Sequence, residues 1–239
     1  MRNLPNMEAH ARTVLKELGA KALPIPEDLA FMSANFKGTE VTMRSQAWQT
    51  EAFRLVRETV LLYPGKLRSF NFVIYPFNHF DAPIFATDFL LLGNKLRIGL
   101  VDAMPLFAED PGYNQRWVAP FVPLHRKAVN IARQYDRKMN WSLKYTGNAA
   151  CLATEVAPEQ LPLVCSLWQE YLQLYLQLSR ELEPVPVQKE KQVQEWHRAY
   201  NKEHLEVENQ RNPLMVYFGQ ETGRRYNREF LFAENFGKA

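Results

Sequence analysis

The chain has 239 residues, of which 46% are hydrophobic and 13% aromatic, which is enough apolar mass for the core of one large domain. This composition excludes disordered, collagen-like and low-complexity proteins. The 29 lysines and arginines nearly balance the 26 aspartates and glutamates, and the net charge of +3 is weaker than nucleic-acid-binding proteins usually carry.

The amino-terminal part of the chain is predicted to contain two helices and a hairpin. Residues 1–20 carry apolar side chains at spacings of three and four, which predicts a helix that ends near Gly19. Residues 29–36 and 39–48 show an extended pattern on either side of a Lys-Gly pair, which is typical of a β-hairpin. An apolar stripe predicts a second helix over residues 50–62.

The centre of the chain is predicted to be rich in strands, and the rest mainly helical. The expected strands are residues 67–76, 83–92 and 95–104, and the expected helices lie at about 121–137 and 158–182, with two or three more between 188 and 232. No internal repeat or long linker divides the chain. We therefore expect a single domain over residues 1–239 with an α+β fold, in which helices cover both faces of an antiparallel sheet.

Two connections allow the strand register to be predicted. If Gly93-Asn94 closes a tight hairpin, Asp88 lies opposite Gly99. If the loop of residues 77–82 closes symmetrically, Asp88 lies opposite Asn71. Because side chains alternate along a strand, one face of three adjacent strands then carries a single cluster. Its expected members are Asn71, Val73, Ala86, Asp88, Gly99 and Val101.

A carboxylate in the middle of a central strand needs an explanation, because an unpaired buried charge is costly. One interpretation is structural: Asp88 hydrogen-bonds Asn71, and Gly99 only relieves packing. The other is functional: Asp88 is a buried acid whose pKa is raised by desolvation, beside a gap that admits a flat ligand. Asp102 is expected on the opposite face in a structural role, and His79 and Asp81 are expected to form the connecting loop.

The cysteines and histidines do not predict a metal centre. Cys151 and Cys165 lie fourteen residues apart without a CxxC pair, and the five histidines show no metal-ligand spacing, so we expect free thiols and no metal. No segment is apolar enough to span a bilayer, and no secretory signal opens the chain. We expect a cytoplasmic protein, or one of the plastid stroma if the chain is a processed eukaryotic product.

Several of these segments resemble the ferredoxin-dependent bilin reductases. The resemblance covers roughly residues 29 to 236, and its motifs are Asn71–Pro76, Asp81–Asp88, Gly99–Asp102, Tyr217–Tyr226 and Phe230–Phe232. It implies a three-layer α/β/α sandwich that binds a linear tetrapyrrole such as biliverdin between the sheet and the carboxy-terminal helices. It also implies that a [2Fe-2S] ferredoxin supplies electrons one at a time, without a tightly bound cofactor; no GxGxxG or P-loop motif contradicts this.

The resemblance assigns roles to particular positions. Asp88 matches the central proton donor of the family. Asn71 stands where reductases of the D-ring vinyl group carry a histidine; an amide can hydrogen-bond the bilin but cannot act as an acid. Many members also have a second aspartate near the carboxy terminus, and here an ungapped alignment puts Glu208 there, followed by Asn209. A missing second aspartate implies a two-electron reduction of biliverdin at its 15,16 double bond, in phycoerythrobilin biosynthesis.

The expected substrate contacts combine the cluster with cations for the propionates. They are Asn71, Val73, Ala86, Gly99, Arg97 and Asn209, with Arg211 and Lys144 as further candidates for the propionates. The expected partners are the bilin, reduced ferredoxin and a following reductase that receives the product, with no nucleic acid or membrane. Arg224, Arg225 and Arg228 are candidates for docking an acidic ferredoxin.

Two alternatives remain open at this stage. One is a bilin reductase of other regiochemistry, which converts dihydrobiliverdin to phycoerythrobilin or completes a four-electron reduction through Glu208. The other is a bilin carrier without redox activity, which would need a pocket but no acid inside it.

Overall fold

The computed structural model describes residues 7–131, 145–211 and 213–233. Its centre is an eight-stranded antiparallel sheet in the order β1-β3-β4-β5-β6-β7-β8, with β2 paired to β3. The strands are β1 (Lys21–Ala22), β2 (Phe31–Phe36), β3 (Thr39–Gln49), β4 (Phe53–Tyr63), β5 (Leu67–Pro76), β6 (Ile84–Leu92), β7 (Lys95–Met104) and β8 (Cys151–Val156). The predicted hairpin and the three central strands are confirmed.

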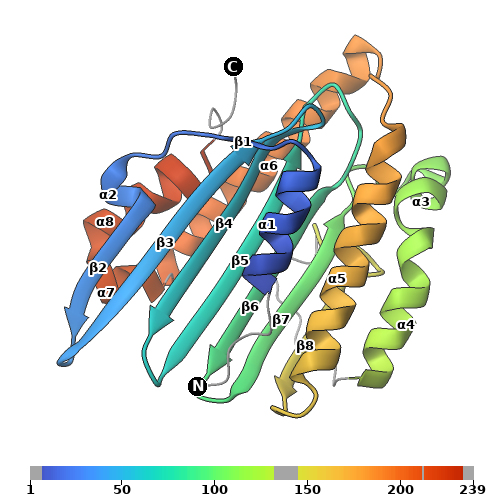
Figure 1. Cartoon of the computed structure of the whole chain (residues 1–239). Helices are drawn as coiled ribbons and strands as arrows, with labels where there is room; N and C mark the ends of the chain where they lie inside the picture. Colours follow the sequence, from blue (N-terminus) through green and yellow to red (C-terminus); the bar gives the residue numbers. More distant parts are fainter. Residues whose placement is uncertain (1–6, 132–144, 212, 234–239) are drawn as a thin grey trace.

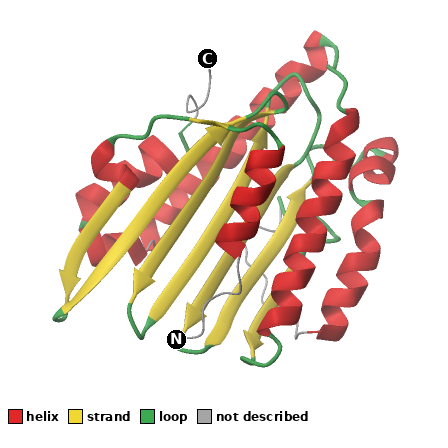
Figure 2. Ribbon diagram, viewed as in Figure 1, coloured by secondary structure: helices red, strands yellow, loops and turns green. Residues whose placement is uncertain are grey.

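Helices cover both faces of this sheet, so the molecule has three layers (Figures 1 and 2). One face carries α1 (Met7–Glu17), α3 (Pro111–Trp117), α4 (Val122–Ile131) and α5 (Leu161–Leu178), and the other carries α6 (Val187–Arg211), α7 (Pro213–Phe218), α8 (Gln220–Tyr226) and the π-helical turn η3 (Asn227–Leu231). Short helices α2 (Glu27–Ala30), η1 (Ala119–Phe121) and η2 (Ser179–Glu181) join these elements. The predicted α+β sandwich is confirmed; part of the helix predicted over 121–137 lies outside the described residues.

Each face has its own hydrophobic core. Under α1 and α5, Phe70 and Phe72 pack edge-on against Trp168, which donates a hydrogen bond to Thr87. Under α6 and α8, residues such as Val73 and Ala86 pack with aromatic side chains of those helices. The two predicted free cysteines are both buried thiols. None of the described helices is long and apolar enough to cross a membrane.

The helix predicted over residues 50–62 is wrong, because this segment is the central strand β4. Every residue from Phe53 to Leu61 is buried, since helices cover the sheet on both sides. A strand buried on both faces shows a continuous apolar run rather than alternation, and that run was indistinguishable from a helical stripe. The correction matters because β4 carries Arg54, Arg57 and Glu58 into the interior.

Glu58 is a buried acid on the face that α1 covers. Its side chain is 1% exposed, and neither carboxyl oxygen has a hydrogen-bond partner within the described part of the chain. Desolvation, and then the nearby charge of Glu8, raise the pKa of Glu58 from 4.5 to about 7. Between these two values the folded chain holds a proton that the unfolded chain has lost. The free energy of unfolding therefore falls as pH rises through this interval.

We predict that Glu58→Gln removes this pH dependence. Between pH 4.5 and 8 the unfolding free energy of the wild type should fall by about 3 kcal/mol more than that of the variant, because each unit of pKa shift corresponds to about 1.4 kcal/mol. Urea denaturation at several pH values measures the difference. Glu51→Gln is the matched control, since Glu51 is exposed and should keep the wild-type slope. Parallel curves for the wild type and Glu58→Gln would contradict the prediction.

Candidate active site

Strands β5 and β6 bring the predicted polar pair together in the middle of the sheet. Asn71 pairs with Asp88, and Val73 pairs with Ala86, as the loop symmetry predicted. All four side chains lie on the face covered by α6 and α8, because Val73 and Ala86 belong to the core on that side. This part of the predicted cluster is confirmed.

The predicted position of Gly99 is wrong by one residue. Leu92 pairs with Lys95 and Leu91 with Leu96, as a turn at Gly93-Asn94 requires, but a bulge then shifts the register. Asp88 consequently faces Leu100, and Gly99 pairs with Phe89 on the other face. A one-residue shift turns every later side chain to the opposite side of the sheet.

Gly99 has a packing role on that opposite face. A Cβ atom there would lie 2.9 Å from Leu96 Cδ2 and 3.1 Å from Phe89 Cε1. The missing side chain therefore accommodates two apolar side chains of the α5 side and opens no space beside Asp88. The same shift moves Val101 into the core under α5, so neither residue belongs to the face of Asp88.

Asp102, which we expected on the opposite face, lies on the same face as Asp88. It pairs with Ala86 in the shifted register and is 2% exposed. Its Oδ2 accepts a hydrogen bond of 2.8 Å from the backbone N–H of Gly147. Desolvation raises the pKa of Asp102 to about 8 despite this bond. The carboxyl therefore anchors the segment before β8, which agrees with the structural role predicted for it.

Asp88 is the end of a hydrogen-bonded row that crosses three strands. Arg57 of β4 is buried, and its Nη1 donates a 2.6 Å hydrogen bond to Asn71 Oδ1. This bond occupies the amide oxygen, so the amide N–H group of Asn71 is the part that hydrogen-bonds Asp88. Asp88 is partly exposed as a residue, and desolvation is the largest influence on the pKa of its carboxyl.

The electrostatics of this row move the pKa of the Asp88 carboxyl closer to neutrality than that of an exposed aspartate. Desolvation raises the pKa of Asp88 from 3.8 to about 6, while the Asn71 hydrogen bond and the Arg57 charge lower it. At pH 7 about one molecule in ten then carries the proton, which is a usable fraction for a general acid.

Helix α6 places a second row of polar side chains over the sheet. Its inward positions are His197, Asn201, His204 and Glu208, which follow one another at spacings of four, three and four residues. Desolvation lowers the pKa of His204 to about 4, so this imidazole is neutral. Desolvation, and then the charge of Asp88, raise the pKa of Glu208 to about 7, against the opposing effect of Arg57. Asp88 and Glu208 therefore face the same region from the sheet and from α6.

The sequence pattern did not indicate a buried Arg57, because β4 was predicted to be a helix. Arg57 is close enough to Asp88, Glu208 and His204 to affect the pKa of all three. The available signal was the sequence Arg-Leu-Val-Arg-Glu inside an otherwise apolar run. A cation within a strand that is buried on both faces requires a partner. Arg57 pairs with Val73 of β5, and Asn71 lies two residues before Val73 on the same face of that strand.

The remaining predicted substrate contacts either bind other protein groups or lie outside the described residues. Asn209 accepts a 3.1 Å hydrogen bond from Asn227 Nδ2 and so ties α6 to η3. Arg97 is the residue inserted by the bulge; it is half exposed and forms a 2.7 Å ion pair with Glu155. Lys144 and the side chain of Arg211 lie outside the described residues. Their roles toward a propionate stay predictions.

The other charged residues named from the sequence are mostly engaged. Asp81 binds Lys189 at 2.7 Å and Arg116 at 3.4 Å, which ties the β5–β6 loop to α6 and α3. His79 in the same loop stacks on Phe77 and contacts the tilted ring of Phe80. Both therefore have structural contacts, as predicted for the loop.

The proposed docking cations are partly neutralised. Arg225 binds Asp28 and, at 2.9 Å, Glu229, and Arg228 also binds Glu229 at 2.9 Å. This pairing weakens the positive potential that these residues would offer to an acidic partner. Within the described residues no group of three metal-ligating side chains occurs.

Comparisons with known proteins agree with this geometry. The family model for ferredoxin-dependent bilin reductases matches residues 8–233. The chain belongs to the ferredoxin-dependent bilin reductase family. It is 26% identical to the 15,16-dihydrobiliverdin:ferredoxin oxidoreductase of Nostoc punctiforme, over 96% of this chain and 94% of that protein. The same enzyme of Gloeobacter violaceus is 25% identical with the same coverage.

A solved structure shows the same fold. Phytochromobilin synthase from tomato, crystallised in complex with biliverdin, superposes with a TM-score of 0.81 at 18% identity, covering 95% of this chain and 83% of that chain. The antiparallel sheet with helices on both faces is thus the fold of a bilin reductase, and the chain is an oxidoreductase by family.

Proposed function

We propose that the protein reduces biliverdin at its 15,16 double bond to 15,16-dihydrobiliverdin, with electrons from ferredoxin. The observation that carries the proposal is Asp88 itself, a partly exposed residue paired with Asn71 in mid-sheet, whose carboxyl pKa is raised to about 6. The names of the two relatives that match almost the whole chain support the regiochemistry. The bilin would lie between the sheet and α6, against Val73 and Ala86.

The reaction adds two electrons and two protons across the bridge. The π bond between C15 and C16 breaks, each carbon gains a hydrogen, and two ferredoxin molecules are each oxidised by one electron. Asp88 supplies one proton as a general acid, the second proton comes from solvent, and Asp88 is then reprotonated from solvent. Asn71 binds pyrrole or lactam groups but gives no proton, so the chemistry is confined to the bond near Asp88.

The product of an anaerobic assay tests this proposal directly. Biliverdin, reduced ferredoxin and the enzyme should give 15,16-dihydrobiliverdin as the end product by chromatography, without phycoerythrobilin. Phycoerythrobilin from biliverdin alone would contradict a two-electron reaction. A bound bilin whose absorption is unchanged by reduced ferredoxin would instead favour a carrier without redox activity.

Glu208 supports a second candidate function. This is a four-electron reduction in which Glu208 protonates the other end of the bilin. Its carboxyl faces Asp88, and its pKa of about 7 leaves it half protonated at neutral pH. We predict that Glu208→Gln changes the rate of the 15,16 reduction by less than about threefold, since a positioned general acid contributes 10²-fold or more. Loss of a further-reduced product in this variant would establish the second candidate.

We also propose that the product passes to a following bilin reductase in phycoerythrobilin biosynthesis, and that the reaction takes place in the cytoplasm. Relatives from cyanobacteria that include phycoerythrobilin:ferredoxin oxidoreductases support this setting. The family match over residues 8–233 supports a single domain over the chain.

A further inference from the structure

The face of the sheet opposite to Asp88 contains a second hollow that the proposed reaction does not use. It lies between α1 and β3, with a volume of about 460 Å³, which is within the range of small-molecule sites. Its lining residues are Arg12, Leu15, Lys16, Ala20, Arg44, Gln46 and Trp48. Helix α1 buries Met7, Ala11, Val14 and Leu15 against the sheet, and the hollow lies where its polar side overhangs β3.

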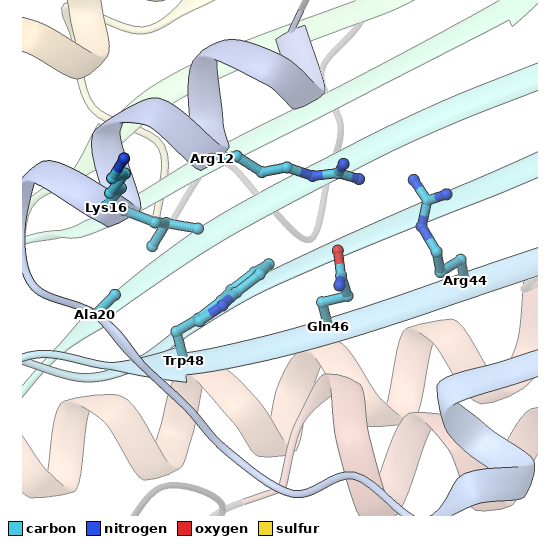
Figure 3. A pocket seen from close by; sticks show the side chains of 7 residues that line it. Arg12, Lys16, Ala20, Arg44, Gln46 and Trp48 are labelled. Carbon is cyan, nitrogen blue, oxygen red and sulfur yellow. The ribbon is translucent and has the colours of Figure 1, made fainter.

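Three cations surround this hollow. Arg44, Gln46 and Trp48 follow one another on the same face of β3, and Arg12 reaches from α1 toward Arg44 above Gln46 (Figure 3). Lys16 lies one helical turn after Arg12, and like charges at this spacing repel each other. An anion between these side chains would relieve that repulsion.

The Glu8 carboxylate beside the hollow is already shared by three arginines. Glu8 accepts hydrogen bonds from Arg44 and Arg68, and it lies 3.7 Å from Arg12. Glu58, the buried cross-strand neighbour of Gln46, has a pKa that desolvation raises to about 7. Its carboxyl is therefore only partly ionised at neutral pH and compensates the cations only in part. The hollow therefore carries a net positive charge.

The floor of the hollow also has an unsatisfied polar group and a flat apolar wall. Gln46 Oε1 is buried without a hydrogen-bond partner among the described residues, and so are both oxygens of its cross-strand neighbour Glu58. Buried acceptors without donors are rare in folded proteins. The half-buried indole of Trp48 supplies a surface on which a ring system can stack. A shift of the flexible Arg12 side chain onto an anion would open Gln46 to the ligand.

We propose that this hollow binds a flat organic anion, with its ring system against Trp48 and its phosphate or carboxylate groups between Arg12, Lys16 and Arg44. Two sources share this chemistry: a nucleotide, and a second bilin molecule with its two propionates. The site is separated from Asp88 by the thickness of the sheet, so its occupation is independent of the proposed reaction.

The test follows the indole N–H signal of Trp48 by NMR, assigned with Trp48→Phe. Adenosine monophosphate at millimolar concentration is one probe, and biliverdin added beyond one equivalent is the other. We expect at least one of them to move this signal, and which one does so identifies the source. Arg12→Gln and Lys16→Gln should each weaken binding about tenfold, as loss of one charge-assisted hydrogen bond predicts.

Lys127→Gln is the matched control, because Lys127 is an exposed cation that binds Glu170 on the far helices and should leave binding unchanged. Biliverdin turnover should also be unchanged in Arg12→Gln and Lys16→Gln, which separates this site from the reaction. A Trp48 signal that neither probe moves, or equal affinities in wild type and both variants, would overturn the proposal. A shift completed by the first equivalent of biliverdin alone would report the active site and would also overturn it.

Discussion

Replacing Asp88 by asparagine should lower the turnover of biliverdin by about 10²- to 10⁴-fold, which is the usual contribution of a positioned general acid. The amide preserves the size of the side chain and can still hydrogen-bond Asn71, but it has no proton to transfer. Binding of the bilin should therefore survive. The measurement is anaerobic reduction of biliverdin by reduced ferredoxin, together with the absorption spectrum of the bound pigment.

Asp102→Asn is the control for that experiment. Asp102 is also a buried acid with a raised pKa on the same face of the sheet, but it is bound to the Gly147 backbone rather than open to a ligand. The amide oxygen can keep that bond, so turnover per folded molecule should change little. Equal loss in both variants would mean that Asp88 acts through the stability of the sheet, and full turnover by Asp88→Asn would remove it from the chemistry.

Replacing Arg57 by glutamine should lower turnover by about 10- to 100-fold, because small misplacements of catalytic groups have effects of this size. Arg57 fixes the orientation of the Asn71 amide, and through it the position of the Asp88 carboxyl. Its charge also lowers the pKa of both Asp88 and Glu208. Without it, both carboxyls should lose their protons at higher pH than in the wild type.

The pH profile distinguishes this positioning role from a general loss of stability. In the wild type, the rate should fall as pH rises above about 6, where Asp88 loses its proton. In Arg57→Gln the falling limb of the pH profile should move to higher pH. Arg57→Lys keeps the charge, so it should return the limb to the wild-type pH while recovering the turnover rate less fully. Arg54→Gln removes another buried arginine of β4, one that lies 4.9 Å from the Tyr75 ring. This control should destabilise the protein without moving the limb, and an unmoved limb in Arg57→Gln would contradict the account.

The pairing of Asp88 with Asn71 could be predicted from sequence because a short loop imposes symmetry on the strands that it joins. The pairing of β6 with β7 could not be predicted, because neither the composition nor the turn residues indicate that Arg97 is inserted as a bulge. A turn at Gly93-Asn94 was correctly placed, yet the bulge beyond it exchanged the two faces of β7. Gly99 and Val101 were consequently assigned to the site, and Asp102 was excluded from its face.

Arg57 was hidden for a different reason. Periodicity distinguishes helix from strand only when one face is exposed, and β4 is covered on both faces. The charged side chains that define the site electrostatics therefore lay in a segment whose structure was predicted wrongly. The resemblance to bilin reductases was carried by β5, β6 and the carboxy-terminal helices, so it identified the family without locating this arginine.

The proposed reaction depends on the protonation of Asp88, which infrared difference spectroscopy of its carboxyl group measures. Spectra of the wild type minus Asp88→Asn, recorded across pH 5 to 8, isolate the C=O stretch of the protonated acid. This band should be present at pH 5, disappear with a midpoint near pH 6, and fall together with the rate of biliverdin reduction. An Asp88 that is already ionised at pH 5, or a rate that stays constant while the band disappears, would contradict this prediction.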